Sequence, residues 1–577
     1  MNRQQRGTLV AVVLGSGIVF LDSTVVNVAL PKIGLEMRSG LLGAFAAENF
    51  VYYSYLLSLS ALLILAGALN DYYGRRRMFA VGLAGFGITS LLCGFAPNII
   101  LLIVFRVLQG ATGALLVPGS LAIITATFEG EEQGRAFGVW AGASAATTIL
   151  GPFVGGILVD AISWRAVFFI NVPLVVLALY FTLTHIAESR DEEATGDFDW
   201  LGAAVIFLAV GGLSFGAIIG QQVNWKGAVP YLALGVGAVA AIAFPFLMKR
   251  SRHPLVPLDL FRSRNFTVTN ISTLVIYGAL YVTFAFLGIF LQGAIGYTPP
   301  AAGLIGIPGT LFLVLFSTRF GKLAARYGSR VFMTVGPALM ALGVLWFVRI
   351  ASNIKPWVFE LRHLSTWVPP ADYARYVLPG MVLFGIGLMI MVAPLTTALM
   401  TSVPKQHSGV ASAINNAISR VGPQLAGAAI FVAIAATFYT GVAARVPGLN
   451  TSSQAFREKV APLNAPQKGI PPAVIRAARD ASTHSFHIAM ALSAALLLAG
   501  AAVNWVGIRN PSREREPDAA ARGAALAEPT GGEPPAADAD QLVDVEMNAK
   551  LVKAHHMLHT HHVPHEHPKE LEEQIPQ

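Results

Sequence analysis

Fourteen long apolar runs, separated by polar segments, dominate the chain. Each run reaches roughly 20 residues, the length with which an α-helix spans a hydrocarbon core of about 30 Å. The first run follows Arg3 and Arg6, contains Asp22 and lacks a convincing cleavage site, so we interpret it as a retained helix. The pattern predicts an all-α membrane protein. Its predicted membrane-spanning helices are 8–30, 48–69, 77–95, 98–120, 135–159, 165–185, 200–221, 228–248, 267–292, 299–318, 331–350, 375–397, 408–438 and 482–507.

A short motif in the first half of the chain returns in the second half. The segment 67–76 recurs in degraded form as 321–330, with Gly, Leu, Tyr, Gly and the final Arg in register. The copies join the second helix to the third and the tenth helix to the eleventh. Setting the helix pair 200–248 aside gives the two copies equivalent positions, so we predict two six-helix bundles plus two inserted central helices. Duplicated halves are typical of transporters, which rock one half against the other around a central site.

Composition supports a membrane protein and argues against a soluble nucleic-acid-binding protein. Hydrophobic residues make up 54% of the 577 residues and charged residues 12%, whereas soluble domains carry about 25% charged residues. We interpret the net charge of +8 as a bias of the loops, so no nucleic-acid partner is expected. Cys93 is the single cysteine, which excludes a disulfide bond within the chain.

Lysine and arginine residues of the short loops gather on one side of the predicted membrane. The positive-inside rule makes that side cytoplasmic, so we expect a multi-pass protein of the cell (inner) membrane with cytoplasmic N- and C-termini. Two longer segments, 351–374 and 439–481, fall on the outer side although they also carry positive charge. The basic residues of the cytoplasmic side are Arg3, Arg6, Arg75, Arg76, Arg77, Arg135, Arg190, Lys249, Arg250, Arg252, Arg262, Arg264, Lys322, Arg326, Arg330 and Lys405.

These features divide the chain into four parts. We expect an N-terminal six-helix bundle over 1–190 and an inserted helix pair with linkers over 191–264. A C-terminal six-helix bundle follows over 265–507 and includes the long outer loop 439–481. Residues 508–577 are polar and rich in Ala, Pro and Glu, which is typical of a disordered tail, here on the cytoplasmic side.

The tail also holds seven closely spaced histidines. Imidazoles at this density can bind a divalent transition metal. We favour a solvated tail with incidental histidines, and we assign neither a metal site nor a cofactor. The histidines are His555, His556, His559, His561, His562, His565 and His567.

Asp22 and Arg106 are the clearest charged residues inside the predicted helices. A charged side chain within the bilayer is costly, so each is a candidate functional residue. Both lie about eight residues from the outer surface, a depth of roughly 12 Å, which permits a salt bridge. One interpretation is a fixed pair that holds two helices together. The other is a proton site, because burial favours the neutral carboxyl group and a guanidinium favours the charged one.

The loop between the second and third helices has two interpretations as well. Its arginines anchor the topology in the ordinary way. Gly67 would allow two helices to approach closely, and Gly74 would allow a sharp turn. Asp71 would cap a helix N-terminus and pair with a basic partner, which would latch the halves on the inner side. Ala325 replaces Asp71 in the second copy, so the latch would be one-sided; the arginines are Arg75, Arg76 and Arg77.

Glycine and proline are concentrated in the predicted fifth helix. Proline removes a helical hydrogen bond and kinks the helix, and nearby glycines let another helix pack against the kink. This pattern predicts a hinge or a tight seal between halves, with a purely structural kink as the alternative. The residues are Gly142, Gly151, Pro152, Gly155 and Gly156.

These motifs together resemble the major facilitator superfamily, specifically its fourteen-helix drug:proton antiporter branch (EmrB/QacA type). The resemblance implies the major facilitator fold and export in exchange for protons. It also implies that Arg106, in the fourth-helix motif, takes part in proton coupling, and that the Gly-Pro motif of the fifth helix is associated with antiport. The resemblance covers about residues 8–507 and rests on 21–31, 67–77, 106–110, 151–156 and 164–173.

Some positions depart from the family pattern. Tyr72 follows the loop aspartate where the family often has arginine, which would weaken an inner latch. Ala166 and Phe50 stand where the family has tryptophan, which would alter packing or pocket shape. No acidic residue lies within the predicted late helices. That absence argues against a two-acid scheme for dicationic drugs and leaves Asp22 as the main proton candidate.

We therefore predict a proton-coupled antiporter of the multidrug efflux type that exports amphipathic or lipophilic small molecules, cationic ones included, by alternating access. Asp22 would bind and release the proton, Arg106 would tune it, and a cationic substrate would compete with the proton for Asp22. Asn416 would alternatively join Asn415 and Arg420 in a structural network. The polar residues that would line the substrate pocket, unless they serve helix packing alone, are Asn27, Tyr55, Gln109 and Asn416.

Other functions compete with this one. A dedicated exporter of one metabolite, lipid or siderophore fits the same features, whereas the Gly-Pro motif disfavours a proton-coupled importer. A membrane-bound sensor or enzyme has little support, because the membrane part contains no nucleophile motif, metal-ligand pair or phosphate-binding loop. No enzyme is therefore expected. The expected partners are the substrate, protons and the lipid bilayer. Segment 439–481 would also suit docking to a periplasmic adaptor and an outer-membrane channel.

Overall fold

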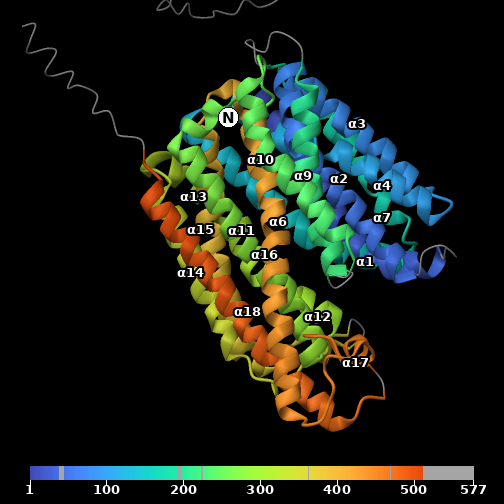
Figure 1. Cartoon of the computed structure of the whole chain (residues 1–577). Coiled ribbons are helices and arrows are strands. Elements are labelled where there is room, and N and C mark those ends of the chain that lie inside the picture. The colour runs from blue at the N-terminus through green and yellow to red at the C-terminus, as the bar shows by residue number, and fades with distance from the viewer. Residues whose placement is uncertain are drawn as a thin grey trace, which may run out of the picture. The chain divides into compact units, whose positions relative to one another are not determined.

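The computed structural model describes residues 1–37, 44–190, 198–222, 225, 227–360, 363–467 and 469–510. The predicted disordered tail beyond residue 510, with its seven histidines, lies outside the described residues. Regular structure in the described part of the chain is helical, without strands. Among these described residues, fourteen helices are long and apolar enough to cross a membrane, and Figure 1 shows how the helices are arranged. The prediction of an all-α membrane protein with fourteen transmembrane helices is confirmed.

Several spans consist of more than one helical segment. The first six spans are α1 (Arg3–Glu36), α2 (Ala44–Tyr73), α3 (Arg75–Gly94), α4 (Ile99–Gly113) with α5 (Leu116–Thr127), α6 (Gly130–Ala161), and α7 (Ala166–Phe169) with α8 (Asn171–His185). The next two are α9 (Trp200–Gln222) and α10 (Val229–Arg250). The last six are α11 (Arg264–Phe290) with the π-helix η2 (Leu291–Ile295), α12 (Pro299–Leu304) with α13 (Ile307–Tyr327), α14 (Arg330–Trp346), α15 (Leu378–Thr401), α16 (Ser408–Arg445) and α18 (Pro472–Gly507). Short connecting segments are η1 (Leu258–Arg262), η3 (Phe347–Arg349), η4 (Leu364–Trp367), η5 (Tyr373–Val377), η6 (Lys405–His407) and α17 (Gln454–Lys459).

Some helices differ in continuity or length from the sequence-based expectation. The fourth predicted helix breaks into α4 and α5, because the ring of Pro118 excludes a helical hydrogen bond to the carbonyl of Ala114. Helix α16 continues to Arg445 and α18 begins at Pro472. These two helices therefore extend into both ends of the segment 439–481.

Side-chain caps fix where some of the helices begin. Asn2 accepts a hydrogen bond from the backbone N–H of Gln5, whose side chain bonds back to Asn2, at the start of α1. Asn98 accepts from the N–H of Leu101 at the start of α4. Such caps satisfy N–H groups that the first helical turn leaves without carbonyl partners.

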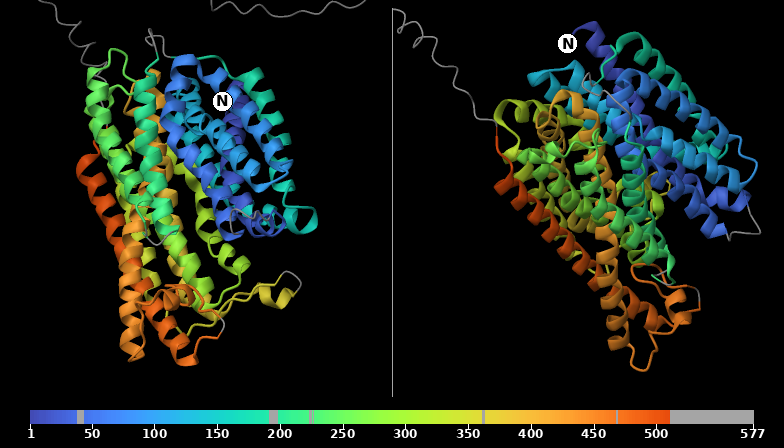
Figure 2. Two further views of the ribbon diagram at one scale, coloured as in Figure 1. Left: turned by 45° about the vertical axis from the view of Figure 1, so that its right-hand side comes forward. Right: turned by 45° about the horizontal axis from the view of Figure 1, so that its top comes forward.

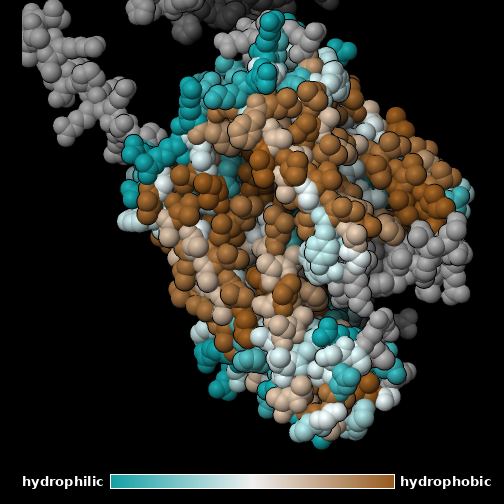
Figure 3. Space-filling view, in the orientation of Figure 1, coloured by the Kyte–Doolittle hydropathy of each residue, from teal (hydrophilic) through white to brown (hydrophobic). Residues whose placement is uncertain are grey.

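The lateral surface of the bundle is apolar. Figure 3 shows hydrophobic residues covering the sides of the molecule, with hydrophilic residues gathered at its two ends. On α10, Val239, Ile242 and Phe246 are each about two-thirds exposed. An apolar surface of this extent marks contact with a membrane, which agrees with fourteen spans.

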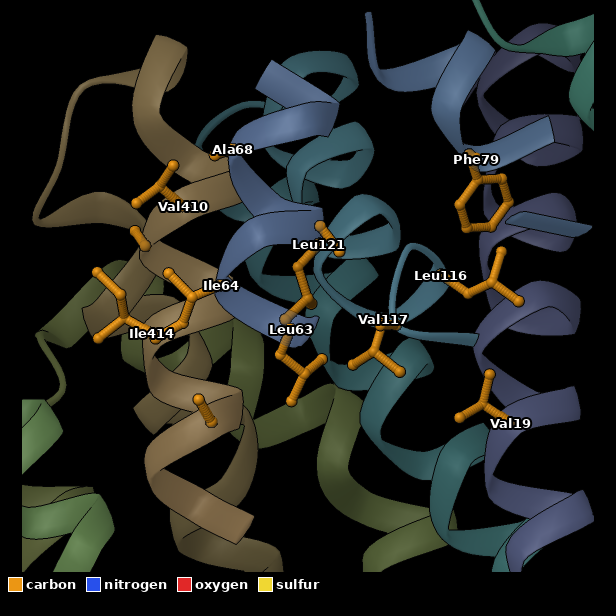
Figure 4. Close-up of a cluster of buried hydrophobic side chains, with 14 of the residues drawn as sticks. Val19, Leu63, Ile64, Ala68, Phe79, Leu116, Val117, Leu121, Val410 and Ile414 are labelled. Atoms are coloured by element: carbon orange, nitrogen blue, oxygen red, sulfur yellow. The ribbon is translucent and has the colours of Figure 1, made fainter. Parts of the chain in front are cut away.

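The spans on either side of the inserted pair meet mainly at one end of the bundle. We call α1–α8 the first half and α11–α18 the second half. The end where α1 begins and α18 ends is the terminal end, and the opposite end, near α12 and α17, is the loop end (Figures 1 and 2). Helix α6 packs on α13, and α2 and α5 pack on α16. In Figure 4, Ile64 and Ala68 of α2 lie beside Val410 and Ile414 of α16, within a hydrophobic cluster shared by the halves.

Helices α9 and α10 form a hairpin that touches both halves. Their axes approach closely where Gly212 faces Gly237, since a Cβ atom on Gly212 would lie 2.9 Å from the Cα atom of Gly237. Helix α9 also packs against α2 of the first half and α16 of the second half. The hairpin therefore covers one side of the junction between the halves.

Candidate functional site

The structure brings Asp22 of α1 and Arg106 of α4 into direct contact. The Nη1 atom of Arg106 lies 2.6 Å from the Oδ2 atom of Asp22, and both side chains are fully buried. The salt bridge that the sequence permitted is therefore present in the structure. Removing one partner of such a buried pair typically costs about 3–5 kcal/mol, because the other charge is left without compensation.

Two amide side chains complete the surroundings of the carboxylate. Gln109 of α4 and Asn171 of α8 donate to Asp22 Oδ1, over 3.2 Å and 3.0 Å. Gln109 also accepts a hydrogen bond from Arg106 Nη1 through Oε1, at 2.7 Å. Asn171 donates to the hydroxyl oxygen of Ser90 as well. Both carboxylate oxygens are thus held by protein donors from two helices.

Tyr55 of α2 supports the arginine rather than the carboxylate. Its ring lies under the guanidinium, with Arg106 Cζ 4.1 Å from the ring centroid. The Tyr55 hydroxyl donates to the carbonyl of Val19, at 3.2 Å. Among the described residues, Arg106 Nη2 is buried without a hydrogen-bond partner. The guanidinium of Arg106 therefore has stabilising neighbours besides Asp22, and its Nη2 group remains able to donate a further hydrogen bond.

This arrangement can accommodate either protonation state of Asp22. Protonation would remove the charge that balances Arg106. The guanidinium would keep the Oε1 atom of Gln109, the carbonyl of Val51 and the ring of Tyr55 as partners. A cation held by dipoles and a π face tolerates the loss of its counter-ion better than an isolated buried charge does. A role of the pair in proton coupling stays a prediction.

Replacing Gln109 with leucine is expected to lower stability more than replacing Tyr55 with phenylalanine. Leucine deprives Asp22 of a donor and Arg106 of an acceptor, and each buried polar group left unsatisfied costs about 1–3 kcal/mol. Phenylalanine removes one hydrogen bond, worth about 0.5–1.5 kcal/mol, and keeps the ring over the guanidinium. Thermal unfolding of both variants in one detergent measures the difference. Equal losses would contradict this role of Gln109.

The four predicted pocket residues do not form one group. Tyr55 and Gln109 belong to the Asp22 cluster just described. Asn27 is exposed on α1. Asn416 donates to the carbonyl of Ser412 within α16, while its neighbour Asn415 donates to Asn270 and Thr273 of α11. The structure therefore separates Asn27 and Asn416 from the ion pair.

Asp71 lies at the terminal end, against the start of α16. Its two carboxylate oxygens accept the backbone N–H groups of Gly409 and Val410, at 3.2 Å and 2.9 Å. Arg75 donates to Asp71 Oδ1 and also to the carbonyls of Lys405 and Gln406. A carboxylate at a helix N-terminus is favoured by the free N–H groups and the helix dipole. One residue pair thus ties α2 and α3 of the first half to α16 of the second half.

Gly74 forms the turn between α2 and α3. Its φ of +104° falls where side chains are disfavoured, and Gly328 between α13 and α14 has a φ of +87°. Glu188, which the sequence did not single out, accepts the backbone N–H groups of Arg76 and Arg77 at the start of α3. These two arginines therefore take part in the turn through their main chain.

The second copy of the motif makes a different contact. Gly321 of α13 packs on Gly134 of α6, where a Cβ atom on Gly321 would lie 2.2 Å from the Gly134 carbonyl oxygen. A Cβ atom on Gly134 would lie 3.0 Å from the Cβ atom of Ala325, which stands where the first copy has Asp71. Ser317 donates to the carbonyl of Gly138 at 2.7 Å. Close helix packing thus replaces the carboxylate contact on this side.

Exposed ion pairs add to the contacts between the halves at the terminal end. Lys405 pairs with Glu129, and Lys322 pairs with Glu131 at 3.3 Å. The hydrogen bond from Lys405 holds the pKa of the Glu129 carboxyl below its usual value. Because the pKa of this carboxyl is lowered, the ion pair stabilises the contact fully at pH values above the usual carboxyl pKa. That stabilisation is lost as the pH falls through the lowered pKa. Exposed pairs contribute little, so this closure rests mainly on the buried contacts.

The Gly-Pro motif of α6 packs mainly against α1. A Cβ atom on Gly151 would lie 1.9 Å from the hydroxyl oxygen of Thr24, and one on Gly155 would lie 3.0 Å from the carbonyl oxygen of Val25. Gly142 instead faces Ser317 of α13, across the halves. Pro152 lies inside α6, and a Cβ atom on Gly156 would meet nothing within 4 Å. The motif therefore shapes the α1–α6 contact behind Asp22.

The structure also reveals an equivalent of this motif that sequence reasoning missed. Gly422 and Pro423 lie within α16, and a Cβ atom on Gly422 would lie 2.7 Å from the carbonyl oxygen of Leu274 in α11. Both Gly-Pro pairs thus pack against the first helix of their own half. A search for the dipeptide in the thirteenth apolar run would have found it.

Comparisons with known proteins agree with this architecture. A family model of the Major Facilitator Superfamily matches residues 12–427. The chain is similar to the multidrug resistance protein Stp of Mycobacterium tuberculosis, with 34% identity over 437 residues, covering 76% of this chain and 77% of that protein. It is 30% identical over 521 residues to the tetracenomycin C resistance and export protein of Streptomyces glaucescens, covering 89% of this chain and 92% of that one. The human organic anion transporter MFSD10 (TETRAN) matches with a TM-score of 0.54 and 12% identity, covering 87% of this chain and 100% of the other, which shows the fold alone.

Proposed function

The chain belongs to the major facilitator superfamily, and from this premise we propose that it is a proton-coupled antiporter of the multidrug efflux type. Family membership makes it a multi-pass membrane transporter of small molecules rather than an enzyme. The transporter exports amphipathic or lipophilic small molecules by alternating access while protons enter. The relatives named for drug resistance and export support this direction of transport.

The buried carboxylate of Asp22 is the observation that carries the proposal. Ionisable residues inside membrane spans are rare and mark proton or ion pathways. Asp22 is fully buried in α1 with Arg106 as its counter-ion. In the proposed cycle Asp22 gains a proton on the outer side and loses it on the inner side. Arg106 pairs with the carboxylate once the proton has left.

The contacts at the terminal end support one half of the alternating-access cycle. Two six-helix bundles, 1–190 and 265–507, rock against each other, with 191–264 as an inserted pair. Gly67, Asp71 and Arg75 latch the terminal end against α16. The Gly-Pro motif of α6 acts as the hinge. Release of the latch opens the terminal end to load substrate.

Orientation follows from the charges of the terminal end. Its arginines and lysines, such as Arg77 and Lys322, place that end in the cytoplasm by the positive-inside rule. Both termini are then cytoplasmic, and the membrane is the cell (inner) membrane. The loop end faces outward, where the segment 439–481 would suit docking to a periplasmic adaptor and an outer-membrane channel.

A dedicated exporter is the second candidate. The name of the Streptomyces glaucescens relative refers to one compound, tetracenomycin C, whereas that of Stp refers to multidrug resistance. Both relatives cover more than two-thirds of this chain. Export of one metabolite, lipid or siderophore would use the same proton site with a narrower substrate site.

Transport by purified protein in liposomes tests the proposal. With the membrane potential clamped by potassium and valinomycin, an imposed pH gradient is expected to drive accumulation of a compound against its own gradient. One pH unit sustains about tenfold accumulation per exchanged proton, since tenfold corresponds to about 1.4 kcal/mol. The panel combines a permanent lipophilic cation, a neutral drug and a lipophilic sulfonate.

The pattern across the panel decides between the candidates. Uptake of several unrelated compounds supports multidrug efflux, and uptake of one class supports the dedicated exporter. Nigericin collapses the pH gradient and provides the control. Transport that continues unchanged after nigericin would contradict proton coupling.

A further inference from the structure

Arg420 is a charged residue of the membrane-spanning part that neither the proton site nor the latch uses. It lies inside α16, nearer the start of the helix than its end, and is partly buried. A charge at this depth is costly unless it has a partner or faces a polar space. The residues around Arg420 therefore indicate which kind of partner its charge could have.

Contacts along α16 show which way Arg420 faces. A Cβ atom on Gly67 of α2 would lie 2.4 Å from the Cβ atom of Ala413 and 2.5 Å from the carbonyl oxygen of Gly409. Gly409, Ala413 and Arg420 lie on one face of a helix with 3.6 residues per turn. Arg420 comes two turns after Ala413, close enough to Tyr52 and Tyr55 of α2 for an electrostatic interaction. Arg420 therefore lies between the halves, beyond the point where α2 and α16 pack tightly.

Within the described residues, Arg420 forms no ion pair. The two buried aspartates of the described spans have other partners: Asp22 is held by Arg106, and Asp71 by Arg75. Every oxygen of these carboxylates already accepts hydrogen bonds from the protein. The counter-ion of Arg420 is thus not supplied by a described side chain.

Aromatic side chains of α2 and α11 lie near this position. Tyr52 of α2 lies within electrostatic reach of Arg420 and of Tyr281 of α11. The ring centroids of Tyr281 and Tyr277 are 6.2 Å apart. Tyr281 is 52% exposed, so about half of its surface is not covered by other side chains. A cation beside an accessible aromatic surface matches an aromatic or apolar molecule that carries a negative charge.

We propose that Arg420 binds the acidic group of the exported molecule, so that the substrates are aromatic or apolar organic acids. The inference rests on the proposed transport function and names its substrate class. A guanidinium binds a carboxylate through two parallel N–H···O bonds, and the tyrosine rings accept the apolar body. A cationic substrate would meet the like charge of Arg420, while Asp22 is fully buried and paired with Arg106. Proton and substrate then occupy different places and exchange through the alternation of the halves.

Binding of a matched set of probes tests this assignment. The probes are 1-pyrenebutyrate, its uncharged amide, and 1-pyrenebutyltrimethylammonium, which share the aromatic body and differ in charge. Equilibrium binding to the full chain in lipid nanodiscs, with empty nanodiscs as the blank, measures each affinity. The carboxylate is expected to bind at least about tenfold more tightly than the cation, because a hydrogen bond to a charged group is worth about 1.5 kcal/mol or more.

Variants of Arg420 separate charge recognition from a structural role. R420Q is expected to weaken carboxylate binding about tenfold to hundredfold and to leave the amide within about threefold, an allowance well under the 1.4 kcal/mol of a tenfold change. R420K keeps the charge without the planar fork, so it should retain part of the preference for the carboxylate. The matched control is R445Q, the same change at an exposed arginine of α16, which should leave all three affinities unchanged.

Each alternative outcome has a defined meaning. Equal binding of carboxylate and cation, no binding of any probe, or equal weakening of all probes by R420Q would overturn the assignment. Because binding requires no pH gradient, a chain that selects the carboxylate but shows no proton-driven transport would keep this inference and overturn only the proposed antiport.

Discussion

Replacing Asp22 with asparagine is expected to abolish accumulation driven by a pH gradient. Asparagine nearly preserves the shape of the side chain but cannot take up and release a proton. The accumulation ratio should fall from about tenfold per pH unit and proton to about one, because a tenfold ratio requires about 1.4 kcal/mol from the gradient. Binding of a pyrene probe should persist, since Asp22 is held by Arg106, Gln109 and Asn171 and forms no ion pair with Arg420 among the described residues.

Stability and transport must be separated in this experiment. Asp22→Asn leaves Arg106 without its counter-ion, and breaking a buried pair costs about 3–5 kcal/mol. Transport by the variant is therefore compared with that of the unmodified chain at a temperature where a thermal unfolding curve shows that the variant is still folded. Asp259→Asn is the matched control, because Asp259 is exposed and its ion pair within the described part of the chain is with the nearby Arg262. This control should transport like the unmodified chain.

The outcome decides between the two interpretations of the ion pair. Proton-driven accumulation that persists in folded Asp22→Asn would contradict a proton site and leave a fixed structural pair. Loss of accumulation with retained probe binding would support the proton site. Loss of both would instead indicate that the substitution disturbs the whole junction between the halves.

Much of the fold follows from the sequence because lipid leaves few alternatives. Backbone groups in the hydrocarbon core must be satisfied within the chain, so long apolar runs form helices. Asp22 and Arg106 were predictable candidates because charge is rare inside such runs. Their equal distance from the outer surface made contact possible. The break after α4 needed one further step, the conflict between Pro118 and the carbonyl of Ala114.

The rest of the site depends on which helices are neighbours. Asn171 reaches Asp22 from α8, and Glu188 binds the turn at Gly74 from far along the chain. Neither contact has a local signal, because each is set by packing between distant helices. The packing of Tyr72 was equally unpredictable from the sequence. Its ring packs edge-on against that of Phe198, with 5.6 Å between the ring centroids. Asp71 pairs with Arg75 one turn on, so this contact does not require an arginine at position 72.

Replacing Gly67 with valine is expected to hold the terminal end open. The first added carbon would lie 2.4 Å from the Cβ atom of Ala413 and 2.5 Å from the carbonyl oxygen of Gly409, so α2 and α16 would have to separate. Overpacking of this kind costs about 1–3 kcal/mol, which shifts the equilibrium away from the closed state about 5-fold to 150-fold. Proton-driven transport should slow because the cycle requires this closure.

Distances between the halves measure this shift directly. Spin labels at R77C and R326C, two exposed positions of α3 and α13, report the separation at the terminal end in a C93A background. Gly67→Val should broaden the distance distribution towards longer values. Gly235→Val is the control, because a Cβ atom on Gly235 would meet nothing within 4 Å. An unchanged distribution in Gly67→Val would mean that the glycine contact does not limit closure. The carboxylate of Asp71 and the α6–α13 contact would then have to hold the terminal end shut by themselves.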